Sequence, residues 1–262
     1  MIEEKISFSF GENWKDFIKY ISEEQIDAAT NDIIGWLGQE NIKNKKVIDI
    51  GSGSGINSLV FFKLGAEKVL SFDFDLHSVE ATSSLWGIAG KPPNWSVFHG
   101  SILDTELIHQ LGKFDIVYSW GVLHHTGDMW NAIENAASLV NEGGYFWITI
   151  YAKGPNYEKH LNLKRRYNAA SPFKKRMMEL IFIVKNMGYR ALYLKKNPLK
   201  WNQKRIRGMD TYHDIVDWLG GLPYEVASEN EIVNNGKKMC TCYGIILYIK
   251  LHNAIEIYPG RL

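Results

Sequence analysis

The stretch VIDIGSGSGINSL, residues 47–59, runs from apolar residues into an acid and then into three glycines within five positions. This pattern is typical of a strand that turns through glycines into a helix, and such a turn lets the backbone approach a nucleotide closely. Gly51 and Gly53 fit the dinucleotide fingerprint G-x-G-x-x-G, but Ile56 stands at its last position. No Lys follows Gly55, as the ATP-type phosphate loop requires. The sequence therefore offers G-x-G-x-G preceded by Asp49, which suits either a nucleotide-binding turn or a tight strand-to-helix turn without a ligand.

Strand-like and helix-like segments alternate five times around this turn. Apolar strand-like runs occupy residues 45–51, 68–75, 94–100, 113–120 and 145–152. Further strands are predicted at 223–228 and 238–251, and amphipathic helices at 12–21 and 23–37. Alternation of this kind builds an α/β fold, here a seven-stranded, mostly parallel sheet with helices on both faces. In such sheets the ligand binds beyond the carboxyl ends of the strands.

The charge of the chain is divided unevenly. The formal net charge is only +1, but residues 153–207 hold sixteen Lys and Arg against two acids, a net +14, which leaves −13 for the rest. A Ser-Pro start at Ser171 predicts a helix over 171–189 within this basic segment. We therefore expect an N-terminal helical segment (1–44), a ligand-binding core (45–152 and 208–262) and a basic helical insertion (153–207) that meets an anionic partner.

One further acid narrows the choice of ligand to an adenosine-containing molecule. Asp73 ends the second predicted strand, 22 residues past Gly51, where a carboxylate accepts hydrogen bonds from both ribose hydroxyls of an adenosine. This position suits NAD as well as S-adenosylmethionine.

The motifs VIDIGSGSG, VLSFDFD, FHGSILD and FDIVYSWGVLHHTGDMW, in this order and spacing, resemble class I S-adenosylmethionine-dependent methyltransferases of the small-molecule branch. The resemblance covers roughly residues 45–151 and implies a Rossmann-like sheet, S-adenosyl-L-methionine as cofactor and no metal. It also implies a set of cofactor-binding residues: Asp49, Gly51, Ser52, Gly53, Gly55, Asp73, Phe74, Ser101, Ile102, Trp120 and Gly121. Asp73 would bind the ribose, Phe74 would pack on the adenine, and Ser101 with Ile102 would flank its edge. Many relatives carry Asp where Ser101 stands, so Asp104 is an alternative adenine contact.

Histidines supply the candidate catalytic residues. His124 and His125 follow the fourth predicted strand, at the edge where the ligand binds, and imidazole suits general-base work near neutral pH. In relatives, a His at the position of His125 often orders a loop, so both roles stay open. A second cluster holds Arg207, Tyr212 and His213, which suit the grip of a carboxylate, phosphate or hydroxyl, with His213 also a catalytic candidate. Asp128 is expected to be the acid at the start of the next helix.

The acceptor is expected to be a small polar or anionic molecule methylated on oxygen, such as a sugar, a phosphate-bearing metabolite or a quinone-type compound. RNA or a membrane lipid at an anionic surface would also suit the basic insertion, although no N-P-P-[YF] motif or RNA-binding module is present. An NAD-dependent oxidoreductase on the same fold, or a cofactor-binding protein without turnover, is the alternative reading. The start lacks a secretory signal and Cys240 and Cys242 suit reduced thiols, so the cytoplasm is the expected location.

Overall fold

The computed structural model describes residues 10–17, 21–201 and 211–252. Within these residues lies one six-stranded sheet whose neighbouring strands are all parallel, in the order β3-β2-β1-β4-β5-β6. Its strands are β1 (Lys46–Ile50), β2 (Lys68–Asp73), β3 (Trp95–His99), β4 (Phe114–Trp120), β5 (Val140–Tyr151) and β6 (Ile246–His252). The order reverses between β1 and β4, and this switch point is where open α/β sheets bind their ligands.

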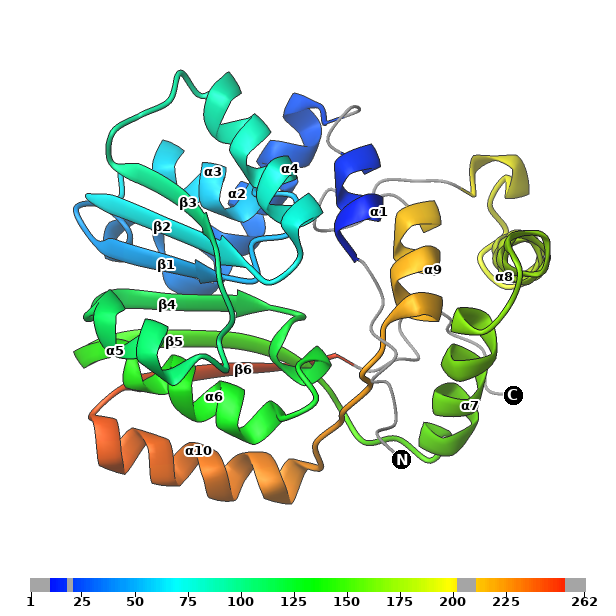
Figure 1. Ribbon diagram of the computed structural model, residues 1–262. Helices are drawn as coiled ribbons and strands as arrows, with labels where there is room; N and C mark the ends of the chain where they lie inside the picture. Colours follow the sequence, from blue (N-terminus) through cyan, green and yellow to red (C-terminus); the bar gives the residue numbers. More distant parts are fainter. Residues whose placement is uncertain (1–9, 18–20, 202–210, 253–262) are drawn as a thin grey trace.

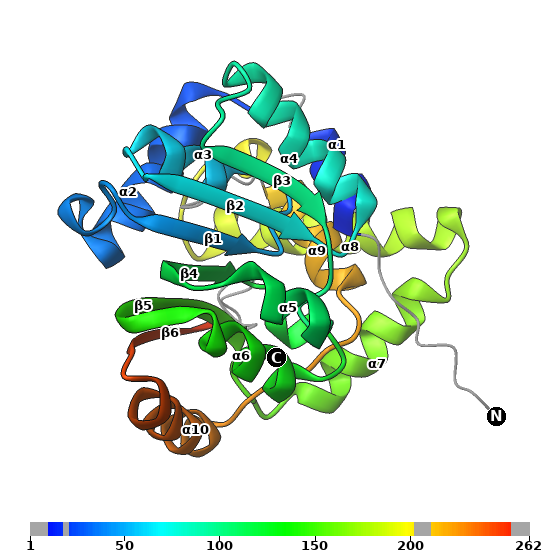
Figure 2. The same cartoon turned by 60° about the vertical axis from the view of Figure 1, so that its left-hand side comes forward.

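Helices cover both faces of the sheet, as predicted (Figure 1, Figure 2). One face carries α2 (Glu23–Leu37), α3 (Ile56–Lys63) and α4 (Leu76–Ile88), and the other carries α5 (Thr105–Leu111), α6 (Met129–Ser138) and α10 (Glu229–Tyr243). Successive strand residues point to opposite faces. In β1, Val47 accordingly packs with the first set of helices and Ile48 with the second. The continuous apolar runs of the sequence are therefore strands buried on both faces.

The last part of the sheet differs from the prediction, because six strands rather than seven lie within the described residues. The predicted strand 223–228 makes only an isolated bridge, between Ala227 and Ala152. The predicted long strand 238–251 is the end of α10 followed by β6. A capping box of Ser228 and Glu231 starts α10, and Gly244 ends it in the left-handed conformation. Both cysteines therefore lie on a helix, as free thiols.

Four more helices lie beyond the carboxyl ends of the strands (Figure 1). They are α1 (Phe10–Phe17), α7 (Tyr157–Asn168), α8 (Pro172–Leu192) and α9 (Thr211–Gly220). Ser171 and Pro172 begin α8, as the Ser-Pro pair predicts. Three single turns, η2 (Gln39–Asn41), η3 (Leu123–His125) and η4 (Pro198–Lys200), complete the helical elements of the described chain. None of the helices in the described ranges is both long and apolar enough to cross a lipid bilayer.

Candidate functional site

The glycine turn follows β1 at the switch point of the sheet. Gly51, Gly53 and Gly55 have φ values of 72°, 55° and 81°, a left-handed region that other residues rarely adopt. Space demands glycine as well, because a Cβ on Gly51 would lie 2.4 Å from the side chain of Val122 and one on Gly55 would lie 2.8 Å from Cα of Thr82. The turn is therefore a tight strand-to-helix connection in which any side chain would displace its neighbours.

Asp73 holds this turn against the end of β2. Its Oδ2 accepts a hydrogen bond from the Gly53 amide at 2.9 Å, and its Oδ1 accepts one from the Asp75 amide at 2.9 Å. Burial raises the pKa of Asp73 to about 6, and the two amide hydrogen bonds act against that rise. A carboxylate has further lone pairs beyond the two used here. The residues therefore fit an adenosine, whose ribose hydroxyls would complete the hydrogen bonding of Asp73.

Asp49, inside β1, ends a chain of buried hydrogen bonds. The Trp95 indole donates to Ser71 Oγ at 2.9 Å, Ser71 donates to Ser58 Oγ at 2.7 Å, and Ser58 donates to Asp49 Oδ2 at 2.5 Å. Burial raises the pKa of Asp49 to about 7, the Ser58 hydrogen bond lowers it, and the charge of Asp73 raises it further. The three donors were missed from the sequence. For Ser58 and Ser71 the signal is a serine among mostly apolar neighbours, since a buried hydroxyl needs a partner.

Ser52 directs its side chain toward α4. The side chain is buried, and its hydroxyl lies 2.9 Å from that of Thr82 on α4, which in turn donates to the carbonyl of Gly53 at 3.1 Å. Only the backbone of Ser52 therefore remains for a cofactor contact.

The predicted adenine side lies at the ends of β2 and β3, which run next to each other with Asp73 paired to His99. The Phe74 side chain is 69% exposed, so its ring is available to pack on a ligand. The His99 ring donates from Nε2 to the Phe74 carbonyl at 2.9 Å and thereby fixes the backbone beside that ring.

The residues that follow β3 make hydrogen bonds and packing contacts within the protein. Ser101 Oγ accepts a hydrogen bond from the Leu103 amide at 3.1 Å. The Ile102 side chain is buried in the core under α6. Asp104, the alternative adenine contact, is the N-cap of α5 and accepts from the Leu107 amide at 3.1 Å. Helix capping therefore accounts for Asp104 without a ligand.

The loop after β4 lies against the glycine turn through Val122. Trp120 ends the strand, and Gly121 follows with a φ of 70° and an amide that donates to the Thr149 carbonyl at 3.1 Å. The buried His124 ring lies 4.2 Å from the His125 ring and 4.4 Å from the Tyr151 ring, between centroids.

His125 is fixed in one tautomer. Its Nδ1 lies 2.5 Å from the carbonyl oxygen of Pro223, and because a carbonyl only accepts, Nδ1 carries the proton and Nε2 keeps a lone pair. Burial lowers the pKa of His125 to about 3, and the charge of Lys164 lowers it further, against the opposing effect of the Pro223 contact. His125 is therefore neutral throughout the physiological pH range.

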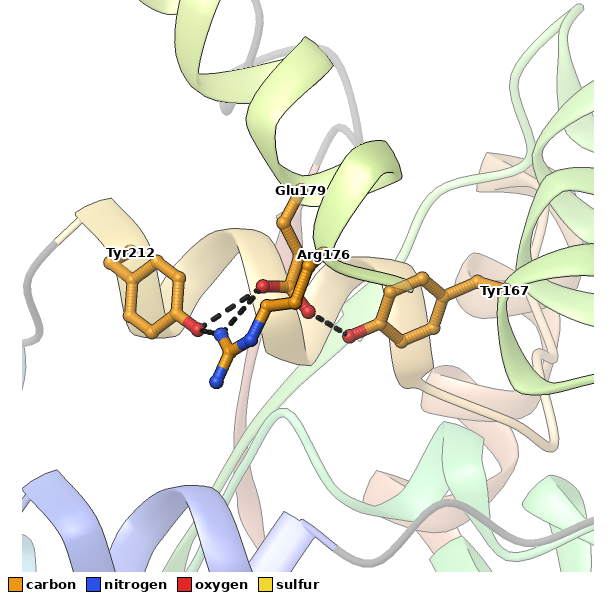
Figure 3. Close-up of polar contacts among 4 residues, drawn as sticks. All are labelled: Tyr167, Arg176, Glu179 and Tyr212. Atoms are coloured by element: carbon orange, nitrogen blue, oxygen red, sulfur yellow. Dashed lines mark hydrogen bonds and ion pairs between the residues drawn. The ribbon is translucent and has the colours of Figure 1, made fainter. Parts of the chain in front are cut away.

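The second predicted cluster is only partly brought to this edge, and Arg207 lies outside the described residues. His213 is buried in α9, and its carbonyl accepts from Asn13 Nδ2 at 3.2 Å. Tyr212 contacts Arg176 and donates to Glu179 Oε2 at 3.1 Å (Figure 3). The hydroxyl of Tyr212 is thus held by α8.

Glu179 is the buried centre of that contact. Arg176 donates to its Oε2 at 2.8 Å and Tyr167 donates to its Oε1 at 2.7 Å, so α7, α8 and α9 meet at one carboxylate (Figure 3). Burial and the neighbouring Glu179 raise the pKa of Tyr212, which keeps its phenol protonated.

Lys164 is a buried cation that the sequence reasoning missed. Its ammonium donates to the Trp218 carbonyl and lies 4.9 Å, 4.8 Å and 5.9 Å from the ring centroids of Trp218, Tyr224 and Tyr151. Burial lowers its pKa to about 7, against the opposing effect of Asp217. The signal was present in α7, where Lys164 stands in a helical stripe with the aromatic residues Tyr157, His160 and Tyr167. Within the described residues no group of three or more His, Cys, Asp or Glu side chains is arranged to hold a metal ion.

Comparison with known proteins agrees with this geometry. The sequence model of a family described as "Methyltransferase domain" matches residues 19–181, more than half of the chain. Ribosomal protein L11 methyltransferase from Legionella pneumophila (strain Lens) is 47% identical over 57 residues, which are 22% of this chain and 20% of that protein. Its counterpart from Prochlorococcus marinus (strain MIT 9312) is 40% identical over 77 residues, 29% of this chain and 25% of that protein. The chain thus spans about a fifth to a quarter of the length of these relatives.

The fold similarity to one solved structure extends over more of this chain. PKMT2 from Rickettsia typhi covers 89% of this chain with 43% of its own, at a TM-score of 0.54 and 19% identity. The family match overturns the NAD-dependent oxidoreductase alternative, and the incomplete dinucleotide fingerprint at Ile56 agrees with that outcome. The chain therefore belongs to the methyltransferase domain family, as a class I methyltransferase whose cofactor is S-adenosyl-L-methionine.

Proposed function

We propose that the chain methylates an oxygen of a small polar or anionic acceptor, and that His125 receives the acceptor's proton. The observation that carries this proposal is the contact of His125 Nδ1 with the Pro223 carbonyl at 2.5 Å. The contact leaves Nε2 with its lone pair, on the loop that follows β4 at the switch point of the sheet. A neutral imidazole in that place suits an acceptor hydroxyl.

The low basicity of His125 is compatible with this role. When bound, S-adenosylmethionine supplies a methyl group that is already activated on a sulfonium, so the chain has to align the acceptor and receive a proton. The acceptor hydroxyl becomes strongly acidic only as its oxygen gains the third bond. An imidazole with a pKa of about 3 is then basic enough to take that proton.

The buried cation supports an acceptor that carries negative charge. Lys164 lies close enough to His125 for its charge to lower the pKa of that imidazole. An anionic group bound beside Lys164 would favour its charged form and repay part of the cost of burying it. The aromatic rings around it would shield the pair from water. We infer that α7 and α9 form the acceptor side of the site and the glycine turn the cofactor side.

The test compares His125→Asn with His109→Asn, a control on the exposed face of α5. Asn retains a donor for the Pro223 carbonyl but lacks a basic nitrogen. Candidate acceptors are hydroxylated and phosphorylated sugars, nucleotide-linked sugars and quinols, and product mass and fragmentation give the methylated atom. We expect His125→Asn to lower kcat by at least about 100-fold and to leave calorimetric affinity for S-adenosylhomocysteine unchanged, because only the proton acceptor is lost. Turnover equal to that of the control would refute the role of His125.

A protein acceptor is the second candidate, because the Legionella and Prochlorococcus relatives are named ribosomal protein L11 methyltransferases. The same assay therefore includes ribosomal protein L11, and an RNA pool as a further arm. Methylation of the protein or of RNA, with no small product, would overturn the small-acceptor proposal. Methylation on nitrogen would overturn the assignment to oxygen.

A further inference from the structure

The helix α8 has two apolar faces, and only one of them is covered. Met178, Phe182 and Ile183 pack against the small core formed by α7 and α9, which contains Tyr167, Ile215, Trp218 and Leu219. That inner face explains how α8 is held on the molecule. The side chains on the opposite face of the helix are not part of this core.

The outer face of α8 is a stripe of exposed apolar side chains. It comprises Phe173, Met177, Leu180, Ile181 and Val184, with spacings of four, seven, eight and eleven residues from the first. These spacings place all five on one side of a helix with 3.6 residues per turn. Phe173 is 76% exposed and Val184 57% exposed. Figure 1 shows α8 at the edge of the molecule, with the sheet far to its inner side.

Basic residues border this stripe. Lys174 and Lys185 fall on one flank of it by helical spacing, and both are exposed. The chain continues past the helix with exposed Lys195, Lys196 and Lys200, among exposed apolar residues such as Leu199. The one acid of α8, Glu179, is buried and held by Tyr167, Arg176 and Tyr212 (Figure 3). The outer face of α8 therefore combines apolar surface with positive charge, and α8 itself places no acid on that face.

We propose that the outer face of α8 docks on an anionic lipid bilayer, with the helix lying in the plane of the surface. An exposed apolar stripe flanked by lysines is the composition of interfacial helices, in which apolar side chains enter the acyl boundary and lysines meet anionic headgroups. No helix of the described chain could cross the bilayer, so the contact is peripheral. A nucleic acid would use the lysines but not the aliphatic stripe. A second copy paired through the same face would bring lysines against lysines.

The test uses the full chain with vesicles of phosphatidylcholine alone and of phosphatidylcholine mixed with phosphatidylglycerol, in flotation assays. We expect flotation with the mixed vesicles only, and we expect it to weaken as salt is raised. The variant Leu180→Ser/Val184→Ser removes part of the stripe, with Ile88→Ser and Val233→Ser as controls at exposed apolar positions on α4 and α10. The variant Lys174→Glu/Lys185→Glu reverses two charges, with Lys237→Glu on α10 as control.

Both α8 variants are expected to weaken vesicle binding by roughly tenfold or more, while the controls bind as the original chain does. Calorimetric affinity for S-adenosylhomocysteine monitors folding in every variant. Equal binding to both kinds of vesicle, or no binding to either, would overturn the proposal. So would a dimer in sedimentation that becomes monomeric in the serine variant without any vesicle binding. RNA binding that is lost on charge reversal but kept in the serine variant, again without vesicle binding, would assign the face to nucleic acid instead.

Discussion

Single hydroxyl groups decide how Asp49 is kept next to the glycine turn. The Ser58 hydroxyl donates to this buried carboxyl, and Ser71 and Trp95 continue the series of hydrogen bonds behind it. Because these hydrogen bonds all point toward Asp49, each hydroxyl donates to the group nearer the carboxylate and accepts from the group farther from it. Asp49 is thereby supported from α3, β2 and β3, the elements that frame the cofactor side of the site.

Replacing Ser58 by Ala is expected to destabilise the protein by about 1–3 kcal/mol, because a buried carboxyl loses its side-chain donor. Urea denaturation followed by circular dichroism gives the free energy of unfolding. Ser84→Ala is the matched control, since the Ser84 hydroxyl is bonded only to the backbone of its own helix at Glu80 and is partly open to solvent. A Ser58→Ala variant as stable as the Ser84→Ala variant would mean that the chain of hydroxyls contributes nothing.

Lys164 gives the stability of the protein a pH dependence. Its pKa falls from an ordinary 10.5 to about 7 because burial penalises the ammonium. Between these two pKa values the unfolded chain binds more protons than the folded one, so stability rises with pH across this window and is flat with respect to Lys164 below about pH 7. We expect Lys164→Met to lose this rise. Unfolding free energies at several pH values between 7 and 10 test it, and equal slopes in both proteins would contradict the buried ammonium.

At the scale of elements, the start of α6 is capped from a distant part of the chain. Glu225 accepts from the Gly127 amide at 2.9 Å and from the Met129 amide at 3.1 Å. Asp128 occupies the N-cap position, yet its side chain makes no capping hydrogen bond. Asp128 therefore stands at the start of this helix, as expected from the sequence, and Glu225 supplies the hydrogen bonds to the amides.

Glu225→Ala is expected to lower the free energy of unfolding by about 1–2 kcal/mol, because it exposes two helix-start amides without a partner. The comparison is Asp128→Ala, for which we expect a change within about 0.5 kcal/mol. Thermal unfolding of both variants under identical buffer conditions measures the difference. The interpretation fails if Asp128→Ala is the more destabilised of the two.

The elements that the sequence predicted best are those buried on both faces. The runs ending at Ile50, Asp73 and Trp120 are mostly apolar, and the glycine turn after the first of them is required by its backbone angles. Residues 238–251 were mistaken for one strand because apolar residues stand on both sides of Gly244. Met239, Cys240 and Cys242 precede it, and a run of β-branched and aromatic residues follows it. The Ser228–Glu231 capping box was the local signal of a helix there.

The acceptor side of the site was harder to predict because it depends on contacts between distant segments. Pro223 fixes the tautomer of His125 across 98 positions, and Lys164 meets Trp218 across 54. No periodicity in the sequence encodes such pairs. The residues predicted to bind the cofactor depend on local sequence instead, since Gly51 and Phe74 directly follow a strand and Asp73 ends one.

At the scale of the whole molecule, α1 lies between the helices that cover the sheet and the other helices beyond the carboxyl ends of the strands. The Gly11 amide donates to Asp75 Oδ2 at 3.0 Å, and a Cβ on Gly11 would lie 2.5 Å from Asp75 Oδ1 and 2.6 Å from the Ser78 amide nitrogen. The Trp14 indole nitrogen would lie 3.1 Å from a Cβ on Gly53. The helix therefore lies over the glycine turn and against the start of α4.

Gly11→Ala is expected to force α1 away from α4 and to weaken binding of S-adenosylhomocysteine by roughly tenfold, because the added methyl has no room. Gly35→Ala on α2 is the control, since a Cβ there meets nothing within 4 Å. Isothermal titration calorimetry of both variants measures the two affinities. Undiminished affinity in Gly11→Ala would show that α1 has no part in holding the cofactor.

The same helix also reaches α9, where Asn13 Nδ2 donates to Asp217 Oδ1 at 2.6 Å. One short helix thus contacts both the glycine turn and α9, the two sides of the site at which the cofactor and the acceptor are proposed to bind. A ligand that tightened α1 on one side would lower the entropic cost of ordering it for the other, so we expect the two binding events to be cooperative. Thermodynamic reciprocity then requires that the donor strengthen acceptor binding by the same factor as the acceptor strengthens donor binding.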